Sequence, residues 1–145
     1  EERVDSFVTV ISEICQNVFE HSMDSGFVAV QTYRTAKGPV VHLVVADSGI
    51  GIEGSFARSG KDYGTGSDLL LKAVTSPISS KRPFGYGLCR VSSIVDQMNG
   101  NLYLRSNAAS IAVMNTPGKG RVSFARREIP FFQGTQISFF VSGGK

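Results

Sequence analysis

The chain has 145 residues, of which 41% are hydrophobic, so we expect one compact domain with a sizeable core and no room for a second. The formal net charge is +3, but Lys and Arg adjoin only at Lys81-Arg82 and Arg126-Arg127, which argues against a nucleic-acid partner. No apolar run approaches the ~20 residues of a membrane span, and the opening residues do not form a signal peptide. We therefore expect a soluble, cytoplasmic protein without membrane contact.

Amphipathic periodicity predicts the first element, a helix over residues 4–24. Two β-rich runs follow at 27–33 and 40–46, and the turn sequence between them predicts an antiparallel hairpin. The second run ends at Asp47.

Residues 53–84 combine Gly, Ser and charged side chains around one short apolar stretch, 68–74. We predict that this stretch is a helix within a long mobile segment. Because structureless loops of this size are uncommon unless they serve function, we expect the segment to be a lid.

The third part of the chain carries a second amphipathic helix, predicted over residues 87–100. The strands predicted after it are 101–105, 110–114, 121–125 and 136–141. This order predicts an α+β fold, a two-layer α/β sandwich in which helices cover one face of a mixed, mostly antiparallel sheet.

The cysteines, Cys15 and Cys89, share no metal-ligand spacing, and each lies within an apolar helical pattern. Two buried reduced thiols are therefore expected in preference to a disulfide.

Two polar residues lie four apart on the first helix and project from one face, Glu13 and Asn17. An amide oxygen suits Mg²⁺, and a carboxylate can polarise water or a substrate hydroxyl. For this pair alone, an ordinary solvated helix face is the stronger alternative.

Asp47 leads from its strand into Gly49-Ile50-Gly51-Ile52. The glycines allow a tight turn and a close approach of the backbone to a flat ligand. A buried carboxylate accepts a hydrogen bond from the adenine amino group, whereas guanine presents an oxygen there. A plain Asp-Gly turn is the alternative.

A glycine pair immediately precedes the second long helix, in Gly85-Tyr86-Gly87-Leu88. Free backbone N–H groups and the helix dipole can face a phosphate there. The loop is not a Walker A motif, because no Gly-Lys-Ser or Gly-Lys-Thr follows. Lys72, Lys81 and Arg82 lie in or beside the lid and could reach phosphate oxygens, with solvated side chains as the alternative.

These motifs, followed by Gly134-Thr135 at the start of the last strand, resemble the N, G1, G2 and G3 boxes of the GHKL superfamily. Gyrase B, a heat-shock chaperone, histidine kinases and MutL share this ATP-binding Bergerat fold. The resemblance extends from residue 5 to 142 and implies one histidine-kinase-like ATPase domain over 1–145, with ATP and Mg²⁺ as cofactors. It further implies that Asn17 holds the metal, that Glu13 is the general base and that Thr135 helps to bind the adenine edge.

Two branches of the superfamily are similar to different parts of the chain. Glu13 with Asn17 looks like the anti-sigma-factor serine kinases, while residues 87–102 look like the catalytic domain of histidine kinases. The resemblance implies a signalling domain that binds ATP or ADP and acts with a protein partner. Two functions stay open: transfer of the γ-phosphoryl group to a protein or to water, and a nucleotide-gated binding module without significant catalysis.

Overall fold

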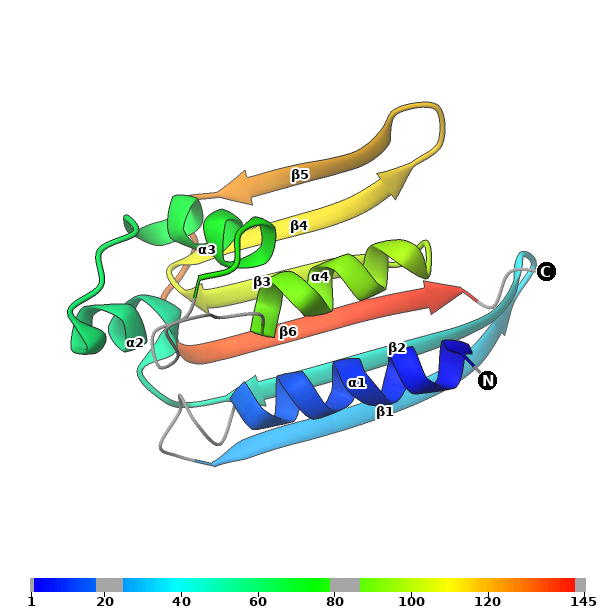
Figure 1. Ribbon diagram of the computed structural model, residues 1–145, viewed down its shortest axis with the longest axis horizontal. Helices are drawn as coiled ribbons and strands as arrows, with labels where there is room; N and C mark the ends of the chain where they lie inside the picture. The colour runs from blue at the N-terminus through cyan, green and yellow to red at the C-terminus, as the bar shows by residue number, and fades with distance from the viewer. Residues whose placement is uncertain (1, 18–24, 79–86, 143–145) are drawn as a thin grey trace.

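The computed structural model describes residues 2–17, 25–78 and 87–142, with side chains from residue 5 onward and without that of residue 17. The helices cover one face of a single sheet, so the domain has two layers, one of helices and one of strands (Figure 1). In chain order the described elements are α1 (Glu2–Asn17), β1 (Gly26–Thr35), β2 (Gly38–Asp47), α2 (Gly51–Ser59), α3 (Gly66–Thr75), α4 (Gly87–Gln97), β3 (Asn101–Asn107), β4 (Ala109–Thr116), β5 (Gly120–Arg126) and β6 (Phe132–Ser142).

The six described strands form one sheet in the order β1-β2-β6-β3-β4-β5. All five pairings are antiparallel, so the predicted α+β sandwich is confirmed and the described strands contain no parallel pair. The last strand, β6, lies between β2 and β3. Strands distant in the sequence are therefore brought together at the centre of the sheet.

The core lies between the helical layer and the sheet. Phe139 of β6 is fully buried and pairs with Leu43 on one side and Leu102 on the other. From the helical side, α1 contributes Val10 and Ile14, which are four residues apart and share one helix face. Each such buried side chain stabilises the fold by about 1.5–3 kcal/mol, so this row anchors both layers.

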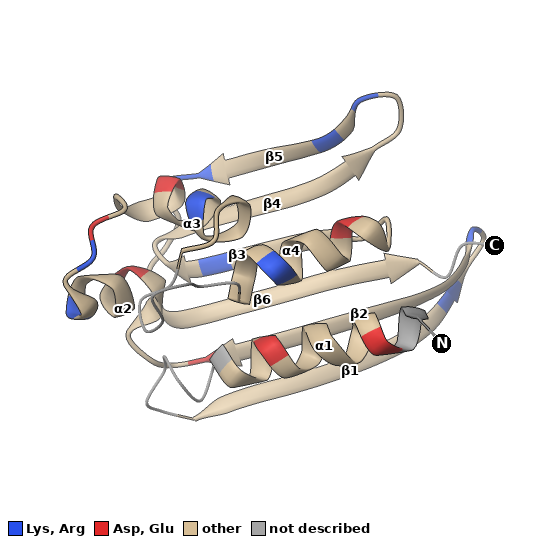
Figure 2. Ribbon diagram, viewed as in Figure 1, with Lys and Arg blue, Asp and Glu red and all other residues tan. Residues whose placement is uncertain are grey.

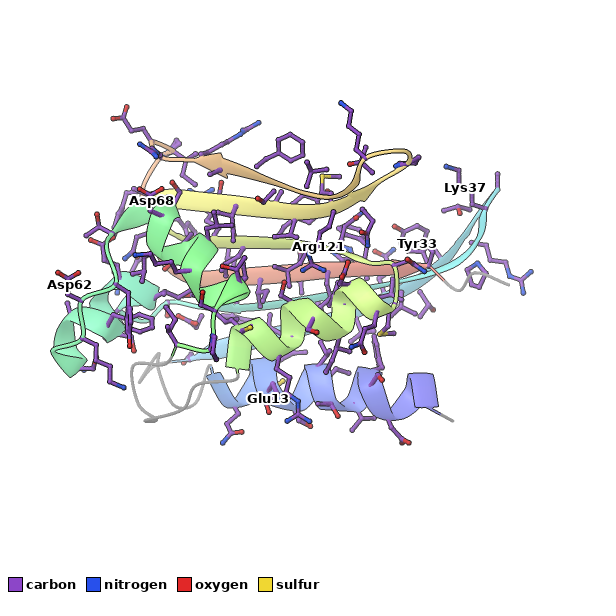
Figure 3. The ribbon with its side chains drawn as sticks, turned by 45° about the horizontal axis from the view of Figure 1, so that its top comes forward. Glu13, Tyr33, Lys37, Asp62, Asp68 and Arg121 are labelled. Atoms are coloured by element: carbon purple, nitrogen blue, oxygen red, sulfur yellow. The ribbon has the colours of Figure 1, made fainter. Side chains whose placement is uncertain are left out.

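The edge of the sheet is also tied to the helices. Arg121 of β5, labelled in Figure 3, places Nη1 2.7 Å from Oδ1 of Asp96 on α4. A second nitrogen, Nη2, donates to the carbonyl oxygen of Ser92, 3.0 Å away. These polar contacts fix β5 against α4.

The predicted elements match the described ones in type. The strands extend up to four residues beyond the predicted ends, and β3 begins where predicted. The α1 helix covers the predicted first helix as far as Asn17, while 18–24 lie outside the described residues. The α4 helix ends three residues earlier than predicted because the N–H of Gly100 donates to the carbonyl of Val95 and closes the last turn. An added Cβ at Gly100 would lie 2.7 Å from the carbonyl oxygen of Phe140, so glycine is required at this cap.

The prediction for residues 53–84 needs correction where the segment is described. Its expected helix is present as α3, but α2 was missed, since two glycines and two serines give residues 51–59 little helix propensity. Burial of Phe56 and a left-handed cap at Gly60 support α2 instead. In α3, Leu70 and Val74 belong to the main core, so this part is packed helix and not a loop that buries little.

Two expectations from composition can be compared with the structure. Cys15 and Cys89 are free thiols, as predicted, but both are half-buried where buried side chains were expected. Among the described helices, none has both the length and the apolar character needed to cross a membrane.

Candidate functional site

The carboxylate of Asp47 lies at the end of β2, where the chain leaves the sheet. Its Oδ1 accepts a hydrogen bond from the backbone N–H of Gly49, at 2.9 Å, and another from that of Thr135 on β6, at 3.2 Å. Two donors from different parts of the chain therefore set the orientation of this half-buried carboxylate.

The backbone of β6 passes unusually close to the end of β2. Gly134 has a φ of 101°, and a Cβ placed on it would lie 2.0 Å from the carbonyl oxygen of Asp47 and 2.8 Å from the Cα of Ser48. Such distances are impossible for a real Cβ, so only glycine at this position lets β6 pass this close to the end of β2.

Gly51 begins α2 with a φ of 75° and is buried against the end of β3. A Cβ on Gly51 would lie 2.6 Å from Asn107 Nδ2 and 2.8 Å from Ser106 Oγ. The next residue, Ile52, donates its N–H to Ser106 Oγ at 2.8 Å, and this oxygen is 3.4 Å from Thr135 Oγ1. The first turn of α2 is thereby fixed to β3 and β6.

Asn107 links the two glycine-containing segments. Its Oδ1 accepts from the N–H of Gly134 and its Nδ2 donates to the carbonyl of Ile50, both at 3.3 Å. The residue has a φ of 51°, a left-handed conformation that asparagine tolerates better than most residues. Sequence reasoning missed both Ser106 and Asn107, although an Asn between two strands is a usable signal for such a turn.

The role predicted for Asp47 is to accept a hydrogen bond from the adenine amino group. A carboxylate of fixed orientation can accept a hydrogen bond from an exocyclic amine, and the missing Cβ atoms of Gly51 and Gly134 let the backbone segments around it pack closely. A family model described as "Histidine kinase-, DNA gyrase B-, and HSP90-like ATPase" matches residues 2–141. The chain belongs to this family. It is a GHKL-type ATP-binding domain, as its motifs predict; no curated protein matches the chain.

In this GHKL domain, Glu13 of α1 faces α4. Its Oε1 lies 3.3 Å from Nη1 of Arg90, in the first turn of α4, and its side chain is 19% exposed against 53% for Arg90. Figure 3 shows Glu13 where α1 runs alongside α4. The residue that the resemblance implies as general base thus lies beside α4, the helix that follows Gly85 and Gly87 in the sequence.

The described residues of the predicted site lie at one end of the sandwich. The C-terminal end of α1, the end of β2 and the start of β6 are all found there, together with the start of α4 (Figure 1). The fold therefore brings Glu13 of the first motif to the same end as Asp47 and Thr135.

The other predicted residues are placed less completely. Gly87 and Leu88 begin α4, and Leu88 packs partly against the core. Lys72 donates from Nζ to the carbonyl of Tyr63, at 2.8 Å. The side chain of Asn17, the last residue of α1, and the whole of Lys81, Arg82, Gly85 and Tyr86 lie outside the described residues.

Proposed function

We propose that this ATP-binding domain transfers the γ-phosphoryl group of Mg-ATP to a partner protein or to water, with Glu13 as the general base. The observation that supports this role is the position of Glu13, mostly buried on α1 and facing the first turn of α4. Bound Mg-ATP would supply the phosphoryl group and a cation that offsets its charge. The chain would supply the proton acceptor, Glu13, and an amide oxygen for Mg²⁺, Asn17.

In this proposal the remaining site residues bind the nucleotide. Asp47 accepts from the adenine amine, supported by the two backbone donors that hold its Oδ1. The adenine base is lined by the backbone of Gly49, Ile50, Gly51 and Ile52, and the hydroxyl of Thr135 helps to bind its edge. The phosphates are bound by Gly85, Tyr86, Gly87 and Leu88, together with Lys81.

Asp47→Asn tests the base-binding role. The amide oxygen can still accept from Gly49 and Thr135, but a donor NH₂ replaces an acceptor oxygen, so ATP binding should weaken by about 2 kcal/mol or more and the preference for adenine should collapse. Calorimetry with ATP and GTP measures both effects.

Asp62→Asn is a matched control. Asp62 is exposed in the loop between α2 and α3, and its Oδ1 accepts from the N–H of Gly64 at 2.9 Å, the same local bond that Asp47 makes to Gly49. The Asp62→Asn variant should prefer ATP over GTP as strongly as the wild type does. Equal affinity of the unmodified domain for GTP and ATP would refute the assignment of Asp47.

We also propose that the connection between α2 and α3 closes over bound triphosphate. Gly60, Gly64 and Gly66 have positive φ angles there, and an added Cβ at Gly60 or Gly66 would meet no atom within 4 Å, so this loop is loosely packed. Hydrogen exchange should slow across residues 60–66 when Mg-ATP is added, while residues 69–74 of α3 stay protected in both states. Strong protection of the amides of residues 60–66 from hydrogen exchange in the absence of nucleotide would contradict the proposed closure of this loop.

A nucleotide-gated binding module is the second candidate, and one observation favours it. The Oε1 of Glu13 lies 3.3 Å from Nη1 of the Arg90 guanidinium, so this oxygen is engaged within the protein. In this case ATP would control a partner without turnover. The response of turnover to substitution of Glu13 separates the two functions.

A further inference from the structure

The face of the sheet opposite the helices is apolar where a solvated face is expected. In antiparallel sheets with one buried face, the other face carries polar side chains. Here a groove of about 730 Å³ crosses that face, and its apolar lining includes His42, Tyr103, Met114, Phe124 and Phe140. We call it the outer groove.

The lining is organised rather than scattered. The rings of His42 and Phe140 stack with centroids 3.8 Å apart, and Tyr103 meets Phe140 edge-on at 5.8 Å. Phe124 on β5 is 58% exposed and lies opposite Ala112, which in turn lies opposite Tyr103. Contiguous exposed apolar surface of this kind marks interaction sites.

The charge at one end of the outer groove has a single sign. Arg105 and Arg126 both pair with Ser110 of β4, one from each side, so the two backbones are roughly 10 Å apart and both side chains share the outer face. Asp47 is the one acidic residue within the six described strands, and it alternates with Leu43 and Val45, which face the helices. Acidic residues otherwise lie on the helices and loops (Figure 2).

The two arginines have capacity for a ligand. Arg126 is exposed, whereas Arg105 donates from Nη2 to the carbonyl of Pro130 and lies 5.7 Å from the ring of Phe132. Its Nε is buried, so a docked carboxylate would have to reach Arg105 through the outer nitrogens of the guanidinium. A carboxylate can accept from guanidinium nitrogens in bidentate fashion, which suits both positions.

We propose that the outer groove docks a protein segment that combines apolar side chains with carboxylates at one end. Aromatic and aliphatic side chains of the partner would cover Tyr103, Phe124 and Phe140, and its carboxylates would pair with Arg105 and Arg126. Single-stranded nucleic acid fits less well, since its backbone is followed by a track of cations and not by two in one row. This docking role is independent of the phosphoryl transfer proposed above.

The groove also lies back to back with the nucleotide site. Arg105 and Gln136, paired across β3 and β6, are the immediate neighbours of Ser106 and Thr135. Successive strand residues point to opposite faces, so a segment held at Arg105 is one residue removed from the site network.

The test uses a panel of synthetic peptides that alternate Leu or Phe with Glu, and the same panel with Lys in place of Glu. With isotopically labelled protein, the acidic panel should shift the amide resonances of Tyr103, Ala112 and Ser138. Arg126→Glu should weaken this binding at least about tenfold. Lys119→Glu, which changes the net charge equally at the exposed β4–β5 turn, should change it less than about twofold.

ATP binding in the same samples separates this proposal from the nucleotide site, because both variants should retain wild-type affinity for ATP. Equal binding of the basic panel, shifts confined to α1 and α4, or no binding of any acidic peptide would each overturn the proposal. So would tighter binding of oligo(dT) that is lost in Arg126→Glu, which would make the groove a nucleic-acid site. Self-association that Phe124→Ser abolishes would make it an interface between copies of the chain.

Discussion

Replacement of Gly134 by alanine should weaken nucleotide binding and destabilise the fold. The added Cβ would lie 2.0 Å from the carbonyl oxygen of Asp47, so β6 and the end of β2 must move apart, and the φ of 101° is itself strained for alanine. Together these effects should lower the free energy of unfolding by roughly 3 kcal/mol or more. ATP affinity should fall at least about tenfold, because the movement displaces the Asp47 carboxylate from its backbone donors.

Gly118→Ala provides the control for backbone strain alone. Gly118 also has a positive φ, 77°, but an added Cβ would meet no atom within 4 Å. Gly118→Ala should lower the free energy of unfolding by only about 1–2 kcal/mol and leave ATP affinity unchanged. Denaturant unfolding and calorimetry measure both quantities, and equal losses in the two variants would show that the contact with Asp47 is unimportant.

Turnover should fall at least about a hundredfold in Glu13→Gln, whereas nucleotide affinity should change by less than about tenfold. Glutamine keeps the size of the side chain and its place at the α1–α4 interface but cannot accept a proton as glutamate does. The measurement is phosphoryl transfer from labelled ATP in the presence of the true partner. Equal rates for wild type and Glu13→Gln would select the nucleotide-gated binding module.

Arg90→Ala distinguishes loss of the base from loss of the ion pair. Glu13→Gln removes both, whereas Arg90→Ala removes only the pair. Because Arg90 is 53% exposed, the pair should be weak and turnover should change by less than about tenfold. A hundredfold loss in Arg90→Ala would instead mean that the pair holds Glu13 in position.

Local signals were sufficient for most of the fold. Runs rich in β-branched and aromatic residues identified β2 and β6, and helical periodicity identified α4, which buries one stripe against the core. By contrast, α2 is supported by contacts that periodicity does not record. Phe56 is buried by tertiary packing, and Gly51 is buried against residues 106 and 107, more than fifty positions away.

The same limit applies to the site. Asp47 and Thr135 were predicted from motifs, but Ser106 and Asn107, which bond to Ile52 and Ile50, were not, since the last two residues of β3 belong to no motif. The pairing of Glu13 with Arg90 spans 77 positions and depends on how α1 and α4 pack. Spacing within one helix predicts which side chains share a face, whereas contacts between helices require the fold.

The central place of β6 has a consequence for how the domain is made. Neighbours in the sequence can pair early, β1 with β2 and β3 with β4 and β5, but these two units share no pairing until residues 132–142 have been synthesised. The nascent chain therefore exposes the unpaired edges of β2 and β3 during translation. Pairings between such distant segments are slow to form, so the domain should complete its fold only after its last strand has emerged.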